Sequence, residues 1–170
     1  MSAAARIARK TILAVTAFAF CIFLGGCVFE APITTTATRK VDPRLLGEWA
    51  PKGGGGKVMT VGRLDELTYI VLTDSLFFRA HHSDVAQTAF VSAQYLDGEA
   101  QRYLYMTWTL SENGTQLELR NVKGGNWQGK NGPIPSEVSK NSTLVQKFLI
   151  ENLQNPDLFE ADTLQFTKAK

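Results

Sequence analysis

The chain after residue 42 alternates apolar and polar side chains over many short segments, and this alternation indicates half-buried β-strands. The clearest case is segment 102–110, in which Leu104, Met106 and Trp108 share one face while tyrosines and threonines occupy the other. Residues of both faces are strong β-formers. We therefore expect a strand here, with Leu104, Met106 and Trp108 pointing into the core.

Shorter segments repeat this pattern and end at turn-forming residues. The further strand candidates are segments 46–50, 57–61, 67–73, 76–81, 89–95, 117–120 and 163–167. Segment 67–73 is almost wholly apolar, aromatic or β-branched, which predicts burial on both faces. The connections include Gly53–Gly56, Asp97-Gly98 and Asn113-Gly114, and connections this short suit antiparallel neighbours. The pattern predicts an antiparallel meander of about eight strands.

One helix is expected before the last strand. Thr143 and Gln146 have the spacing of a capping box, and Asn155-Pro156 ends the helical pattern. The apolar stripe consists of Leu144, Val145, Phe148, Leu149 and Leu153. The fold class is therefore mainly β: a small antiparallel barrel or a strongly bent meander, with one amphipathic helix.

The N-terminus has a different character. Arg6, Arg9 and Lys10 precede an uncharged apolar stretch at 11–24. This stretch is shorter than the roughly 20 residues that a transmembrane helix needs. Residues 1–26 are predicted to be a secretory signal peptide, and an uncleaved N-terminal anchor is the alternative.

The stretch Leu24-Gly25-Gly26-Cys27 resembles the lipobox of bacterial lipoproteins. This resemblance implies cleavage before Cys27, acylation of its thiol, and attachment to a membrane in the cell envelope. Several acyl chains make a stable anchor, because each buried methylene contributes about 0.8 kcal/mol. Val28 stands where an aspartate often marks inner-membrane retention, which favours the outer membrane, facing the periplasm, in a cell that has one.

Composition limits what the exported part can do. Of the 18 basic residues, three lie in segment 1–26, so 15 basic residues remain against 16 acidic ones and nucleic acid is not an expected partner. Cys21 and Cys27 are the two cysteines, so a disulfide within the mature chain is not expected. Residues 27–41 are predicted to form a lipidated, flexible tether rich in threonine, and residues 42–170 a single folded domain.

The start of that domain carries a second resemblance. Leu45-Leu46-Gly47-Glu48-Trp49 resembles the Gly-x-Trp motif that opens the first strand of lipocalin-like barrels, with Asp42-Pro43 as the preceding turn. The resemblance implies that the tryptophan helps to close one end of the barrel. It extends loosely over residues 42–167, where a helix before the last strand also fits. By analogy with that family, a small apolar ligand is one candidate partner.

Residues that suggest catalysis are better explained as structure. His81 and His82 are adjacent on a predicted strand, so they point to opposite faces and cannot hold one metal ion together, even with Asp84 nearby. We interpret them as a solvated strand end. Lys57 after Gly53–Gly56 lacks the serine or threonine and the helix of a phosphate-binding loop.

Other candidate groups have similar explanations. Paired acids at Asp65-Glu66 and at Glu160 with Asp162 fit turns and strand ends. The glycosylation-like triplets at Asn113 and Asn141 fit a turn and a helix start. We expect no catalytic residues, no cofactor and no metal site, and so no enzyme.

Segment 121–142 is a long connection rich in glycine and proline around Trp127. Long loops are often functional, which makes Trp127 a candidate contact residue, whereas folding back to cap the core is the alternative. Three functions remain open: a non-catalytic binding or envelope-interaction domain, a carrier or sensor of a small apolar ligand, and a hydrolase with a dispersed site. A packed interior favours the first, and an open apolar interior favours the second.

Overall fold

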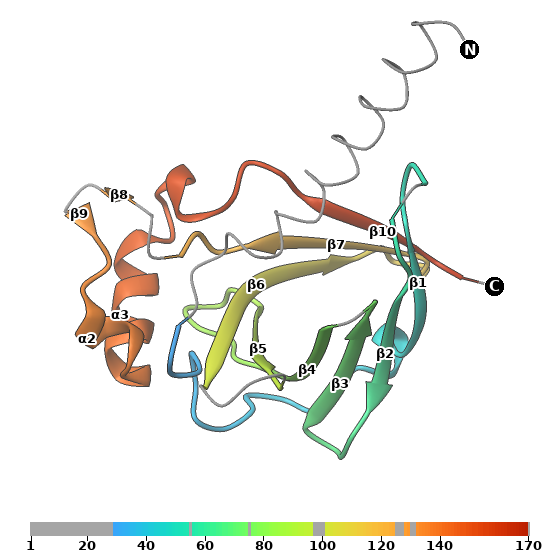
Figure 1. Cartoon of the computed structure of the whole chain (residues 1–170), viewed down its shortest axis with the longest axis horizontal. Coiled ribbons are helices and arrows are strands. Elements are labelled where there is room, and N and C mark those ends of the chain that lie inside the picture. The colour runs from blue at the N-terminus through green and yellow to red at the C-terminus, as the bar shows by residue number, and fades with distance from the viewer. Residues whose placement is uncertain are drawn as a thin grey trace, which may run out of the picture.

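The computed structural model describes residues 29–54, 56–74, 76–96, 101–124, 128–129 and 132–169. Within these ranges, eight antiparallel strands form a closed barrel in the order β1-β10-β7-β6-β5-β4-β3-β2 (Figure 1). The barrel strands are β1 (Gly47–Pro51), β2 (Met59–Arg63), β3 (Thr68–Thr73), β4 (Leu76–His82), β5 (Phe90–Tyr95), β6 (Arg102–Leu110), β7 (Gln116–Asn121) and β10 (Leu164–Lys168). The mainly β class, the barrel and the helix before the last strand are confirmed.

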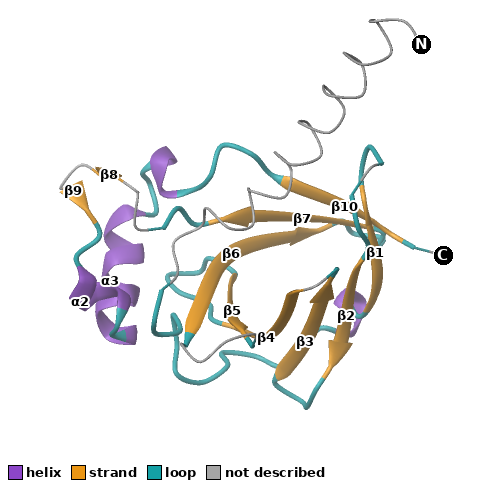
Figure 2. Cartoon of the chain, in the orientation of Figure 1, coloured by secondary structure: helices purple, strands orange, loops and turns teal. Residues whose placement is uncertain are grey.

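The long connection from β7 to β10 contains short elements that the sequence pattern did not reveal. These are the two-residue strands β8 (Gln128–Gly129) and β9 (Gly132–Pro133), the helix α2 (Ser136–Ser139) and the 3-10 helix η2 (Pro156–Leu158). The expected helix is α3 (Ser142–Asn152), and Figure 2 shows both α-helices outside the barrel. The N-cap of α3 is Asn141 and not the predicted Thr143. The side chain of Asn141 accepts hydrogen bonds from the backbone N–H groups of Thr143 and Leu144.

The pairing register decides which side chains point into the barrel. Trp49 pairs with Met59, Val71 with Phe78, Ala93 with Leu104, and Leu119 with Leu164, and each pair lies on the inner face. Leu104, Met106 and Trp108 also lie on this face, as the sequence predicts. Segment 67–73 is not buried on both faces, because Leu72 points outward and is 44% exposed.

The two ends of the barrel differ, and we call them the open end and the closed end. Strand positions at the open end are Pro51, Met59, Thr73, Leu76, Tyr95 and Arg102, and those at the closed end are Gly47, Arg63, Thr68, His82, Phe90 and Lys168. The closed end is covered by the 3-10 helix η1 (Pro43–Leu45), whose Leu45 packs with Trp49 in the barrel core. Asp42 caps this helix through the backbone N–H of Arg44.

The Gly47-Glu48-Trp49 motif has a clear structural role at the closed end. Trp49 is fully buried, and its Nε1–H donates a 2.8 Å hydrogen bond to the carbonyl of Leu45. The ammonium of Lys168 lies 5.3 Å from the indole centroid. Gly47 has φ +119°, a conformation that side chains rarely adopt, so glycine is required there. The motif thus turns the chain into β1 and places the indole across the barrel floor.

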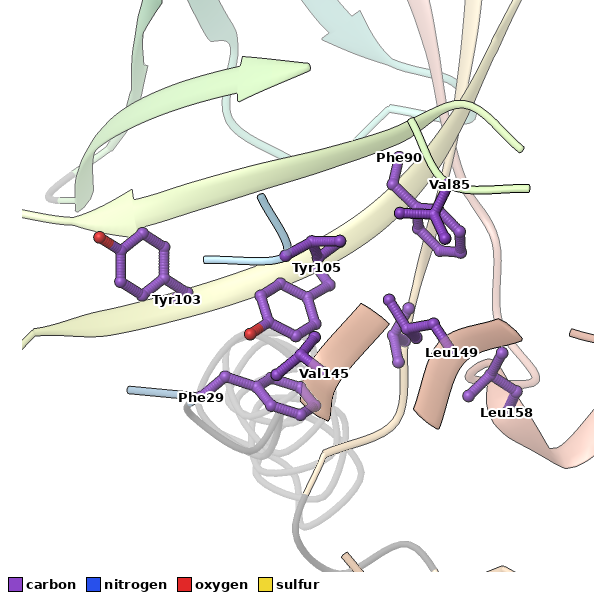
Figure 3. Packing of buried hydrophobic residues seen from close by; sticks show 10 residues of the cluster. Phe29, Val85, Phe90, Tyr103, Tyr105, Val145, Leu149 and Leu158 are labelled. Carbon is purple, nitrogen blue, oxygen red and sulfur yellow. The ribbon is translucent and has the colours of Figure 1, made fainter. Parts of the chain in front are cut away.

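A second hydrophobic core lies outside the barrel, between β5, β6 and helix α3. Figure 3 shows Tyr105 of β6 facing Val145 and Leu149 of the helix, with Phe29 beside them. Phe29 stacks on Tyr105 with 4.0 Å between the ring centroids. The helix therefore covers the outer face of the sheet and does not fill the barrel.

The structure corrects the prediction of a flexible tether for the described residues 29–41. Phe29 pairs with Tyr103 as a β-bridge and Ile33 is fully buried, so we call residues 29–41 the strap. The backbone N–H of Ile33 donates to Ser92 Oγ at 2.9 Å, and Tyr105 Oη donates to the carbonyl of Ala31. The threonine-rich composition hid this packing, because the strap is held by two large apolar side chains and by backbone hydrogen bonds.

Candidate functional site

The inner face of the barrel toward the open end is the candidate site. Several apolar side chains point inward there and yet keep part of their surface in contact with solvent. They are Val71, Leu76, Tyr95, Leu104, Met106, Leu119 and Leu164. Phe78, Ala93 and Phe166 lie deeper and are buried. The interior is thus apolar, and part of its apolar surface is exposed to solvent toward the open end.

Exposed apolar side chains also lie on the outside of the barrel near the open end, along β3, β4 and the neighbouring strand ends. Leu72 and Phe77 are directly paired across β3 and β4 and are 44% and 40% exposed. Leu96 donates its backbone N–H to the carbonyl of Phe77 and is 41% exposed. Val58, just before β2, is 45% exposed. Apolar surface gathered in one place on a protein marks an interaction site.

The barrel floor carries a buried polar chain of three groups. The backbone N–H of Asp42 donates to Tyr69 Oη at 2.6 Å, and Tyr69 Oη lies 2.7 Å from His82 Nε2. His82 is fully buried and its ring meets that of Tyr69 edge to face. Burial raises the pKa of the Tyr69 hydroxyl. The backbone of Asp42, directly after the strap, thus orients Tyr69 and, through it, His82 inside the barrel.

Trp108 extends this group on the neighbouring wall of the barrel. Its ring centroid lies 5.6 Å from that of His82, and the guanidinium of Arg39 lies 5.2 Å from the Trp108 ring. Arg39 is held by a 3.0 Å ion pair with Asp84. Within the described residues, His82 Nδ1 and Trp108 Nε1 are the buried side-chain atoms without a hydrogen-bond partner.

The two histidines do point to opposite faces, but they are not a solvated strand end. His82 points into the barrel, whereas His81 points outward, where its Nε2 lies 3.0 Å from the carbonyl of Thr34. Burial lowers the pKa of His82 to about 4, and the nearby Arg39 acts in the same direction. Burial also lowers the pKa of His81. Both rings are therefore neutral at neutral pH.

This burial predicts a pH-dependent stability. Because the pKa of His82 falls from 6.5 when unfolded to about 4 when folded, the unfolded state binds a proton first as the pH drops. We expect the free energy of unfolding to have its maximum value above pH ~6.5 and to fall by about 3 kcal/mol toward pH ~4. Urea titrations across this range should show the loss, and His82→Gln should remove most of it while His81→Gln keeps most of it. A His82→Gln variant with the slope of the wild type would contradict this assignment.

The other charged candidates have structural roles. Asp65 accepts a hydrogen bond from the backbone of Leu67 in the β2–β3 turn, which lowers the pKa of Asp65, and Glu66 pairs with Lys40. The described part of the chain contains no group of three or more His, Cys, Asp or Glu side chains that could hold a metal ion. Lys57 pairs with Asp74 beyond the glycine-rich turn.

Two predicted site residues, Cys27 and Trp127, lie outside the described residues. The group formed by His82, Tyr69 and Trp108 was missed from the sequence. One signal for it was present: His82 has the same parity as Phe78 and Ala80 on one strand, which places it on the apolar face.

Comparisons with protein-family models, with curated proteins and with solved structures found no match for the chain. No helix in the described ranges is long and apolar enough to cross a membrane.

Proposed function

We propose that the protein is a lipid-anchored, non-catalytic binding protein of the cell envelope that takes a small apolar ligand into its barrel through the open end. The single observation that carries this proposal is the set of inward-pointing apolar side chains that remain accessible at the open end, among them Leu76, Leu104 and Leu164. A ligand that covers these side chains removes their apolar surface from water, and each square ångström removed contributes about 25 cal/mol.

The position of the strap supports a location at the membrane surface. Phe29 is fixed beside Tyr103, the second residue of β6, which begins at the open end. Cys27 precedes Phe29 by two residues, a distance of at most about 7 Å along the chain. A lipid on Cys27 therefore holds the open end close to the bilayer. The exposed Leu72, Phe77 and Leu96 near this end are suited to such contact.

Binding of a neutral fluorescent probe tests the proposed function. N-phenyl-naphthylamine should bind the chain that begins at Val28, with a blue-shifted emission that indicates an apolar environment. Leu76 points into the barrel and Phe77 points out of it, so Leu76→Lys and Phe77→Lys form a matched pair. We expect Leu76→Lys to weaken probe binding by at least about fivefold, because it brings a charge to the apolar site.

The Phe77→Lys variant should bind the probe as the wild type does. An unchanged affinity in Leu76→Lys, or a wild-type protein that fails to bind the probe, would exclude the barrel interior as the binding site. Circular dichroism at the assay temperature confirms that both variants are folded.

Lipidation is tested separately. Cys27→Ser should abolish incorporation of a clickable palmitate analogue in cells and leave an unprocessed precursor, because the thiol that receives the lipid is removed. The matched variant Cys21→Ser, within the expected signal peptide, should be labelled like the wild type. Equal labelling of Cys27→Ser and wild type would refute the lipid anchor.

A further inference from the structure

Two unpartnered polar atoms lie inside an otherwise apolar barrel. His82 Nδ1 and Trp108 Nε1 are both buried without a partner in the described part of the protein, and their rings are neighbours on the inner face. A buried donor without a partner lowers the stability of the folded protein, because it has given up its hydrogen bonds to water. Such atoms are uncommon in folded proteins, and a polar ligand group is one reason for keeping them.

Both atoms are donors. The indole nitrogen of Trp108 always carries a hydrogen. For His82, the hydrogen is placed by its neighbour: Tyr69 Oη already accepts from the backbone of Asp42, so its own hydrogen is free to go to His82 Nε2. A neutral imidazole that accepts at Nε2 carries its hydrogen at Nδ1. The closed end of the barrel thus contains two buried N–H groups that have no acceptor among the described residues.

We propose that the ligand is an amphiphile that enters head first, and that His82 Nδ1–H and Trp108 Nε1–H hold an oxygen acceptor of its head group, a carboxylate or a carbonyl, near the closed end. Its apolar chain then lies against Met106, Leu104 and the other accessible side chains toward the open end. This inference rests on the proposed function, because it needs a ligand inside the barrel.

The surroundings favour an acceptor over a cationic head group. Arg39 lies over the Trp108 ring, so a positive charge already stands near this end of the site. The carboxylate of Asp84 is used by Arg39, and that of Asp42 is used by Arg44. Tyr69 Oη is occupied by Asp42 and His82. An ammonium head group would therefore meet two donors and a cation, whereas an oxygen acceptor completes both hydrogen bonds.

Displacement of N-phenyl-naphthylamine by three ligands of equal chain length distinguishes an oxygen-acceptor head group from a cationic one. The ligands are dodecanoate, methyl dodecanoate and dodecylamine. We expect dodecanoate and its ester to displace the probe at concentrations at least about tenfold lower than dodecylamine, a difference of about one to two hydrogen bonds. An acid that binds while the ester does not restricts the head group to a carboxylate and still supports the proposal.

The donor groups are tested by Trp108→Phe, which removes the indole N–H from a partly exposed side chain and keeps an aromatic ring. This variant should bind dodecanoate about five- to tenfold more weakly and dodecylamine within about twofold of the wild type. Trp49→Phe is the matched control, since its N–H already has Leu45 as a partner, and it should keep the ratio between the two ligands.

The outcomes separate the two proposals. If the probe binds but acid and amine displace it equally, or if Trp108→Phe keeps the wild-type ratio, the head-group site is wrong while the apolar binding function stands. If neither the probe nor any of the three ligands binds, the proposed function itself fails.

Discussion

A chain shortened to begin at residue 42 is expected to lose at least about 4 kcal/mol of unfolding free energy relative to one that begins at residue 28. This is the largest effect that we predict, because the shortened chain lacks the whole strap. For a domain of this size, such a loss is a large part of the total stability. The shortened chain should be partly unfolded at room temperature or accumulate as aggregates.

The reason lies in what the strap covers. Phe29 and Ile33 are 2% and 0% exposed, and each contributes on the order of 2–5 kcal/mol when such a side chain is truncated in a core. Their removal also exposes Tyr105 and Phe90 on the outer face of the sheet, and it leaves Ser92 without the backbone N–H of Ile33. The removed backbone recovers conformational entropy, which offsets part of this loss but not the newly exposed apolar surface.

Urea titration followed by circular dichroism measures the difference between the two chains. Phe29→Ala and Ile33→Ala in the longer chain should each reproduce a large part of it. Thr35→Ala is the matched control, because this strap residue is exposed, and it should change the unfolding free energy by less than about 0.5 kcal/mol. Equal midpoints for the long and short chains would show that the strap is dispensable.

The barrel itself could be predicted from the sequence, because strands and tight turns are encoded by residues that are close together in the chain. Alternation of period two in segments such as 102–110 identifies strands and their faces, and glycine-containing turns such as Asn113-Gly114 identify antiparallel neighbours. The Gly47-Glu48-Trp49 motif predicted where the chain enters β1 and which side chain is buried first. Helix α3 was predicted from its apolar stripe, although its N-cap lies two residues before the expected Thr143.

The remaining features depend on contacts between distant parts of the chain. The strap has no periodicity and is fixed by partners far along the sequence, as when Ile33 meets Ser92. Composition alone describes such a segment as a linker. The polar group at the closed end is similar: Tyr69, His82 and Trp108 stand on three different strands, and they come together only when β3, β4, β5 and β6 pair. The adjacent histidines were interpreted as a solvated strand end, because the dipeptide alone does not show how deeply each ring is buried. That burial depends on the pairing register of β4.

The second large effect is expected at the closed end, where Trp49→Ala should lower the unfolding free energy by about 3–5 kcal/mol. Trp49 is fully buried, packs with Leu45 and Met59, and gives its N–H to the carbonyl of Leu45. Alanine at this position leaves a cavity behind η1 and an unpaired carbonyl, and both penalties act at the same place. Since Lys168 lies over the indole and donates to the carbonyl of Arg44, the substitution also loosens the contact between β10 and η1.

Trp49→Phe isolates the aromatic part of this effect, because it retains a ring but loses the hydrogen bond to Leu45 and part of the volume. We expect it to fall between wild type and Trp49→Ala in a urea titration of the chain that begins at residue 28. The neighbouring Glu48 is exposed, so Glu48→Ala should shift the midpoint very little. If Trp49→Ala unfolds at the urea concentration of the wild type, the indole does not hold the floor of the barrel. In that case the closure depends instead on η1 and on the hydrogen bond from Asp42 to Tyr69.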